Sequence, residues 1–95
     1  MGMRFIGSFK KTCSFEDWLK LVDSLKRQMD KHGLKLIFAT ESEDGTSIYD
    51  VGEAATMEGV QAFLSDPEVR QMRIDAGVDI DSQEVICAVR KFNVF

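Results

Sequence analysis

The chain has 95 residues, of which 44% are hydrophobic and 29% charged, and its formal net charge is −4. This length fits a single domain over residues 1–95, and so short a chain gains useful burial by associating with a partner. The acidic balance argues against a nucleic-acid partner, and no apolar run approaches the ~20 residues of a membrane span.

The first predicted element is a strand over residues 3–11. Phe5, Gly7 and Phe9 alternate with more polar positions, which is the period of two that a strand requires. Ile6 falls on the opposite side from Phe5. This strand therefore has apolar side chains on both faces.

A helix is predicted to follow Ser14 and to end at Gly33. The Ser14 hydroxyl can cap the free amides of the first turn, and Asp17 stands at the reciprocal position of a capping box. Gly33 suits a left-handed helix end. One apolar stripe runs along the helix at helical spacing, and it consists of Phe15, Trp18, Leu19, Val22, Leu25 and Met29.

Two further strands are predicted over residues 34–41 and 46–54, joined by a hairpin loop with the Asp44-Gly45 turn signal. The contiguous apolar run of residues 36–38 indicates burial on both faces of the earlier strand. In the later strand Asp50 shares a face with its neighbours two residues away, at positions 48 and 52.

The remaining elements are a second helical region over residues 57–76 and a last strand. Asp66-Pro67 should kink the helical region, because proline fits the first turn of a new helix better than the interior of an old one. Residues 78–81 are predicted to be a connecting loop, and residues 83–95 a strand that is apolar on both faces.

The order of these elements, βαββαβ, predicts an α+β fold of the ferredoxin-like kind, with an antiparallel four-stranded sheet and two helices on one face. The other face of the sheet is also apolar. Leaving it in water would expose a patch larger than a monomer usually tolerates. We therefore expect a homodimer in which the helix-free sheet faces meet, a dimeric α+β barrel.

Three stretches resemble a known family: residues 14–18, the strand end Ile48-Tyr49-Asp50-Val51-Gly52, and the helix at 57–67 that runs into Ser65-Asp66-Pro67. They are similar to the dimeric α+β barrel superfamily, in particular its antibiotic-biosynthesis-monooxygenase-like and stress-responsive A/B-barrel-like domains. The resemblance covers nearly the whole chain and implies the same dimeric barrel. The superfamily hosts many activities, so the fold alone names none.

The chain departs from that family at the positions that carry its chemistry. Phe63 stands where the monooxygenase-like pattern often has histidine, Gly52 replaces a tryptophan, and Arg73 occupies the place of the iron-ligating histidine of heme-degrading members. His32 is the single histidine and has no cysteine or second histidine at ligand spacing. We therefore expect neither a cofactor nor a metal.

Four residues are the candidates for a ligand pocket: Trp18, Asp50, Phe63 and Arg73. The resemblance places the face that carries Asp50 under the helices, where desolvation would raise the pKa of the carboxyl group. Arg73 could reach it from the second helical region. The plainer interpretation is a half-exposed polar pair at the sheet edge and a core tryptophan.

Three functions stay open at this point. The leading hypothesis is a protein that binds a small apolar or aromatic molecule. The alternative is a cofactor-independent enzyme, monooxygenase-like or isomerase-like, with Asp50 as base and Arg73 as anion anchor. The third is a non-catalytic interaction or regulatory domain. An enclosed cavity of ~300 Å³ or more would favour the first two, and a filled interior the third.

The two cysteines, Cys13 and Cys87, are too few for a disulfide framework. The first residues have none of the features of a secretory signal. We therefore expect free thiols and a cytoplasmic location.

Overall fold

A computed structural model describes residues 2–91, 93 and 95. The described chain forms four strands and three helices. In chain order these are β1 (Met3–Lys11), α1 (Phe15–Lys31), β2 (Leu34–Glu41), β3 (Ser47–Ala54), α2 (Met57–Ser65), α3 (Pro67–Ala76) and β4 (Val78–Val89). None of these helices is long and apolar enough to cross a membrane.

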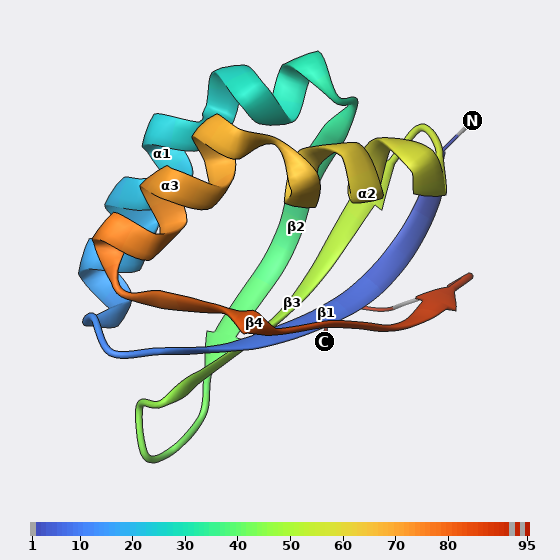
Figure 1. The fold of residues 1–95 in the computed structure, drawn as a ribbon. Helices are drawn as coiled ribbons and strands as arrows, with labels where there is room; N and C mark the ends of the chain where they lie inside the picture. The colour runs from blue at the N-terminus through green and yellow to red at the C-terminus, as the bar shows by residue number, and fades with distance from the viewer. Residues whose placement is uncertain (1, 92, 94) are drawn as a thin grey trace.

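The four strands form one antiparallel sheet in the order β2-β3-β1-β4. All three helices lie over the same face of this sheet, and no helix of the described residues covers the opposite face (Figure 1). The predicted antiparallel, ferredoxin-like arrangement is therefore confirmed. The arrangement leaves every strand with an inward side, under the helices, and an outward side.

The expected count of two helices is not confirmed, because the second helical region forms two separate helices. Asp66 has an extended backbone, with ψ at 121°, so α2 ends before it. The Asp66 carboxylate accepts a hydrogen bond from the Glu68 backbone N–H and caps α3, whose first residue is Pro67. The kink predicted at this step is therefore a complete break, after which a new helix begins.

The last strand differs from the prediction at both ends. Residues 78–81 are not a loop: Val78 pairs with Lys11, so β4 begins there. An irregularity follows, where the Lys10 backbone N–H donates to the Ser82 hydroxyl at 2.7 Å instead of to a ladder carbonyl. The aspartates of this segment resemble turn residues, but Val78 and Ile80, which alternate with them, pack against the core.

At its other end β4 stops at Val89 rather than at residue 95. Phe92 and Val94, which the prediction also assigned to this strand, lie outside the described residues.

The core lies between the sheet and the helices. Phe9 of β1 packs against Trp18 of α1 with ring centroids 5.8 Å apart. Burial of this apolar surface provides the main drive for covering the sheet. The buried cluster consists of Phe9, Trp18, Leu21, Leu25, Ile48, Phe63, Val69 and Val78.

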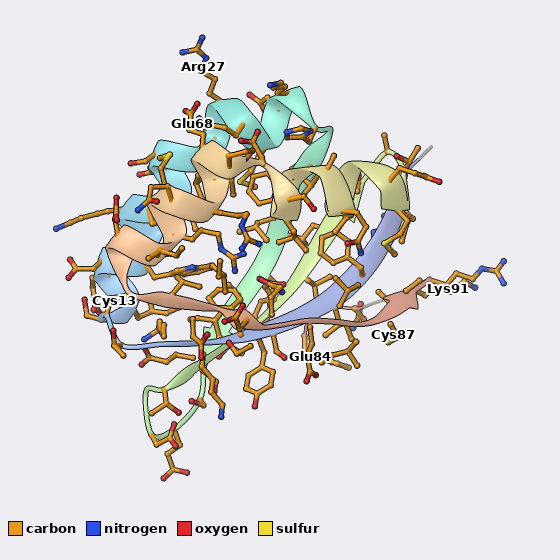
Figure 2. The ribbon with its side chains drawn as sticks, in the orientation of Figure 1. Cys13, Arg27, Glu68, Glu84, Cys87 and Lys91 are labelled. Carbon is orange, nitrogen blue, oxygen red and sulfur yellow. The ribbon has the colours of Figure 1, made fainter. Side chains whose placement is uncertain are left out.

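The outward side of the sheet carries a band that we call the apolar row. Strand register places Phe38 opposite Val51, Val51 opposite Ile6, and Ile6 opposite Cys87, so the row crosses all four strands. Phe38 is 57% exposed. Figure 2 shows Cys87 on the side of the sheet away from the helices. The apolar outward face expected from the sequence is thus present as this row, while other pairs on the same side, such as Arg4 opposite Glu53, are charged.

The inward side contains a tight contact between β1 and β3, and substitutions at this contact can test the packing. A Cβ atom added to Gly52 would lie 2.5 Å from Cζ of Phe5, whose ring covers this glycine from the neighbouring strand. We expect Gly52→Ala to lower the free energy of unfolding by about 1–3 kcal/mol.

Phe5→Leu removes the obstructing ring, so the double variant should be less destabilised than the sum of the two single variants. Urea denaturation of the four proteins measures this coupling. Additive free energies would contradict the proposed contact.

Candidate functional site

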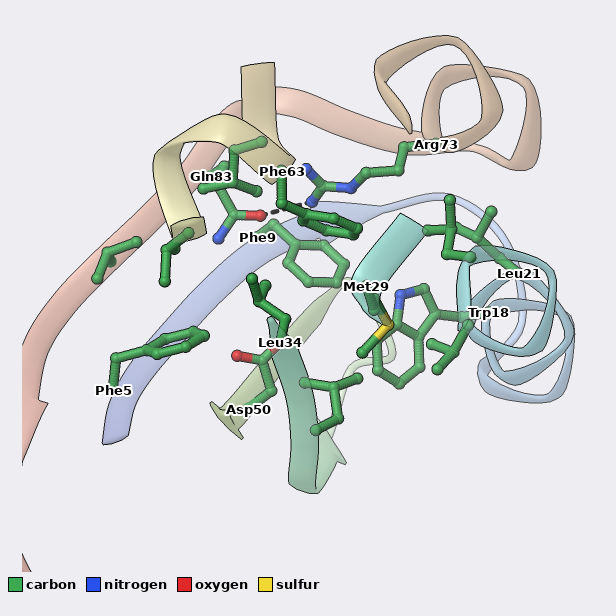
Figure 3. A pocket seen from close by; sticks show the side chains of 16 residues that line it. Phe5, Phe9, Trp18, Leu21, Met29, Leu34, Asp50, Phe63, Arg73 and Gln83 are labelled. Atoms are coloured by element: carbon green, nitrogen blue, oxygen red, sulfur yellow. Dashed lines mark hydrogen bonds between the residues drawn. The ribbon is translucent and has the colours of Figure 1, made fainter. Parts of the chain in front are cut away.

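A cavity lies between the inward face of the sheet and the helices (Figure 3). Its volume is about 70 Å³. Most of its wall is apolar and comes from β1, β2, α1 and α2; examples are Phe5, Leu34, Leu36, Val60 and Leu64. Three polar side chains interrupt this wall, one each from β3, α3 and β4: Asp50, Arg73 and Gln83.

Glycine in β1 makes room for the first of these polar groups. Gly7 is the cross-strand partner of Asp50, and a Cβ atom added to it would lie 2.8 Å from Asp50 Oδ1. The carboxylate therefore lies across the position that a side chain at residue 7 would occupy. This close approach explains why the strand has glycine between Phe5 and Phe9.

Asp50 is a desolvated acid. It is 9% exposed and faces inward between Ile48 and Gly52, as the alternation of β3 requires. Burial raises the pKa of its carboxyl group to about 6, against the opposing influence of the Arg73 charge and a hydrogen bond from the Gly7 backbone. At neutral pH the group is mostly ionised, yet it accepts a proton readily.

Arg73 reaches the cavity from α3 and is 5% exposed. Burial lowers the pKa of its guanidinium to about 10, so it stays charged at neutral pH. Its Nη2 donates to Gln83 Oε1 at 2.5 Å, and its Cζ lies 5.0 Å from the centroid of the Phe9 ring. The guanidinium is therefore fixed by an amide at one edge and by an aromatic ring at its face.

Gln83 holds Arg73 in place. Its Nε2 donates to the backbone carbonyls of Ser8 and Glu84, both at 3.2 Å, which leaves Oε1 to accept from Arg73. Figure 3 shows the guanidinium and the Gln83 amide meeting at the upper side of the cavity, with Asp50 across from them.

Asp50 and Arg73 do not form an ion pair. Both belong to the described residues, and no nitrogen of the Arg73 guanidinium lies within 4.0 Å of an Asp50 carboxylate oxygen. Two opposite charges thus face the same small cavity without contact. Such an arrangement costs more free energy than a direct pair or an apolar core, and it is typical of functional sites.

The structure brings all four predicted pocket residues to this one cavity: Trp18, Asp50, Phe63 and Arg73 line it together. Trp18, 4% exposed, also belongs to the core, so it is both core and pocket wall. The plainer interpretation of Asp50 and Arg73 as a half-exposed pair at the sheet edge is wrong, because both are buried.

Sequence reasoning missed Gln83 and Gly7. The predicted strand began at Gln83, and the two irregularities of the β1–β4 register hide which of its residues face inward. The signal that could have found Gly7 is the pattern Phe5-Gly7-Phe9, in which one position of an otherwise aromatic face has no side chain.

The remaining chemistry-bearing residues lie away from the cavity wall. Cys13 and Cys87 are free thiols, and His32 pairs with Asp66 at 3.1 Å. Among the described residues, no group of three or more histidine, cysteine, aspartate or glutamate side chains could hold a metal ion.

The fold is similar to that of a solved protein described as a "putative Antibiotic biosynthesis monooxygenase" from Chloroflexus aurantiacus J-10-fl. The match covers 100% of this chain and 97% of that chain, with 16% identity and a TM-score of 0.50. No protein-family model matches the sequence, and a comparison with curated proteins finds no match. At this identity the likeness shows the fold alone, and it agrees with the α+β, ferredoxin-like arrangement predicted from the sequence.

The raised pKa of Asp50 predicts a pH dependence of stability. Because its pKa rises from 3.8 to about 6 on folding, the native state binds more protons than the unfolded state between these values. Stability should therefore fall by about 3 kcal/mol as the pH rises through this window. Asp50→Asn cannot ionise, so it should gain about this much stability relative to wild type between pH ~4 and pH ~7.

Urea denaturation across this pH range measures the effect. Asp75→Asn, which removes an exposed carboxylate from α3, controls for the loss of one charge. A constant difference between Asp50→Asn and wild type at every pH would show that Asp50 is not desolvated.

Proposed function

We propose that this chain is a small α+β barrel domain that binds a small, mainly apolar molecule between its sheet and its helices. One observation supports this above all others: Asp50 and Arg73, both buried, face an apolar cavity without touching each other. A cavity with apolar walls and a few converging polar groups is the usual form of a small-molecule site.

The size of the cavity restricts the ligand. Its volume of about 70 Å³ is below the ~300 Å³ typical of drug-sized sites, and volume alone would favour the interaction-domain alternative. The converging charges favour a ligand instead, because a purely structural core has no use for them. An apolar cavity that holds benzene measures about 150 Å³. We therefore favour small aliphatic ligands over aromatic ones.

A cofactor-independent enzyme is the second candidate, and the pKa of Asp50 favours it. A carboxyl group with a pKa of about 6 suits a general base that works near neutral pH. Arg73 would anchor the negative charge that develops on the substrate. The monooxygenase activity in the name of the structurally similar protein belongs to that protein, and the residues of this cavity do not specify an oxygenation.

We further propose that two copies associate through the apolar row. Phe38, Val51, Ile6 and Cys87 make the middle of the helix-free face apolar, and covering it adds burial that so small a domain otherwise lacks. A regulatory partner using this same row is the third candidate. The free thiols of Cys13 and Cys87 support a reducing, cytoplasmic compartment.

The proposed dimer can be tested with two variants. One places a charge in the apolar row, and the other places the same charge on the helical side as a control. Phe38→Lys places a charge in the apolar row and should convert a dimer into a monomer at micromolar concentration. Ile74→Lys, at a 48% exposed position of α3, is the matched control and should remain dimeric. Sedimentation equilibrium measures both. A monomeric wild-type protein would defeat the proposal.

Ligand binding can be tested by native mass spectrometry of freshly purified protein and by an NMR screen of small, mainly apolar compounds that each carry one hydrogen-bonding group. We expect bound compounds to shift the signals of Trp18 and Val60, which line the cavity. Arg73→Met should weaken binding tenfold or more, because it removes a buried charged donor.

Arg70→Met makes the same change at an exposed position of α3 and should bind as wild type does. A screen in which no compound shifts the signals of the cavity residues would contradict the proposed ligand site.

A further inference from the structure

We infer that the cavity selects a neutral molecule with a hydrogen-bond donor beside an acceptor, as in a short-chain primary amide, and this inference rests on the proposed ligand-binding function. The donor would bind the Asp50 carboxylate, and the acceptor would bind the Arg73 guanidinium.

Charge excludes ionic ligands. Of the residues that line the cavity, Asp50 and Arg73 are the two that carry a charge near neutral pH, and their charges cancel. An anion or a cation would leave an unbalanced charge in a wall made mostly of apolar side chains. Since burying an uncompensated charge is costly, a neutral ligand is favoured.

Geometry requires both a donor and an acceptor. Gln83 and the Phe9 ring fix the guanidinium, while the Gly7 backbone donates to the Asp50 carboxylate. Asp50 and Arg73 form no ion pair, and both line the cavity, so we place the bridging group of the ligand between them. A ligand with only an acceptor would satisfy Arg73 and give Asp50 no donor beyond the Gly7 backbone.

The site already contains an amide in a comparable role. The Gln83 carboxamide accepts from Arg73 through Oε1 and donates to two backbone carbonyls through Nε2. Arg73 is thus already satisfied at one edge by a neutral donor–acceptor group. A ligand amide would repeat this arrangement between Arg73 and Asp50.

Size limits the apolar part. A water molecule occupies roughly 10–15 Å³ on this measure of volume, so a cavity of about 70 Å³ holds about five non-hydrogen atoms. Propionamide has about this size. Four side chains, those of Val22, Met29, Leu34 and Leu36, line both this cavity and an open groove between α1 and β2. The groove therefore lies next to the cavity.

Three probes of the same shape separate the possibilities: propionamide, propionate and 2-butanone. All three have a short apolar chain and a carbonyl oxygen. Propionamide also has a hydrogen-bond donor, propionate has a negative charge, and 2-butanone has neither. We expect NMR titration of the wild-type protein near pH 7.5 to give millimolar affinity for propionamide. Propionate and 2-butanone should each bind about tenfold more weakly, because each lacks the hydrogen bond to Asp50.

A charge-changing variant gives a second, independent readout. Asp50→Asn leaves Arg73 as the charged group of the wall, so propionate should become the preferred probe. Asp75→Asn, the exposed control on α3, should keep the wild-type order. If Asp50→Asn fails to fold, the order of the three probes on wild-type protein still decides the inference.

Each outcome has one meaning. Tightest binding of propionamide supports the inference. If propionate or 2-butanone binds to the cavity residues of wild type as tightly as propionamide, the inference is overturned while the proposed ligand site stands. If none of the three probes shifts the signals of the cavity residues, the inference is overturned, while the proposed ligand site is decided by the wider screen of mainly apolar compounds.

Discussion

The structure of the inward sheet face depends on two positions without side chains. At Gly52 the ring of Phe5 covers the backbone, and at Gly7 the Asp50 carboxylate does so. A side chain at either position would displace its neighbour and close the space above the sheet. Because Gly52 and Gly7 have no side chains, space remains above the sheet for a cavity. The same space allows the Asp50 carboxylate to form part of the cavity wall.

The helices complete that wall from the other side. α3 begins at Pro67 because Asp66 ends α2 and caps the new helix. This break allows α2 and α3 to follow different directions over the sheet, as Figure 1 shows. α3 brings Arg73 to Gln83, while α2 contributes Val60 and Phe63. The two opposite charges of the site thus come from different layers of the fold.

The two faces of the sheet support different functions. Under the helices, desolvation strengthens every electrostatic interaction, which makes the separated Asp50 and Arg73 effective in binding a polar group. On the outward face, the apolar row offers burial without such polar groups. Binding of a small ligand and association of copies would therefore use separate surfaces of the same sheet.

The sequence by itself determined the order of the main elements and the face that Asp50 shares with positions 48 and 52, because periodicity and capping are local properties of the chain. The resemblance, and not the periodicity, placed that face under the helices. The motifs also predicted the fold that the structural similarity confirms. Tertiary structure alone decided the extent of β4, the role of Gln83 and the separation of Asp50 from Arg73. These features depend on strand register, on irregular pairing and on desolvation, which arise only when distant segments pack together.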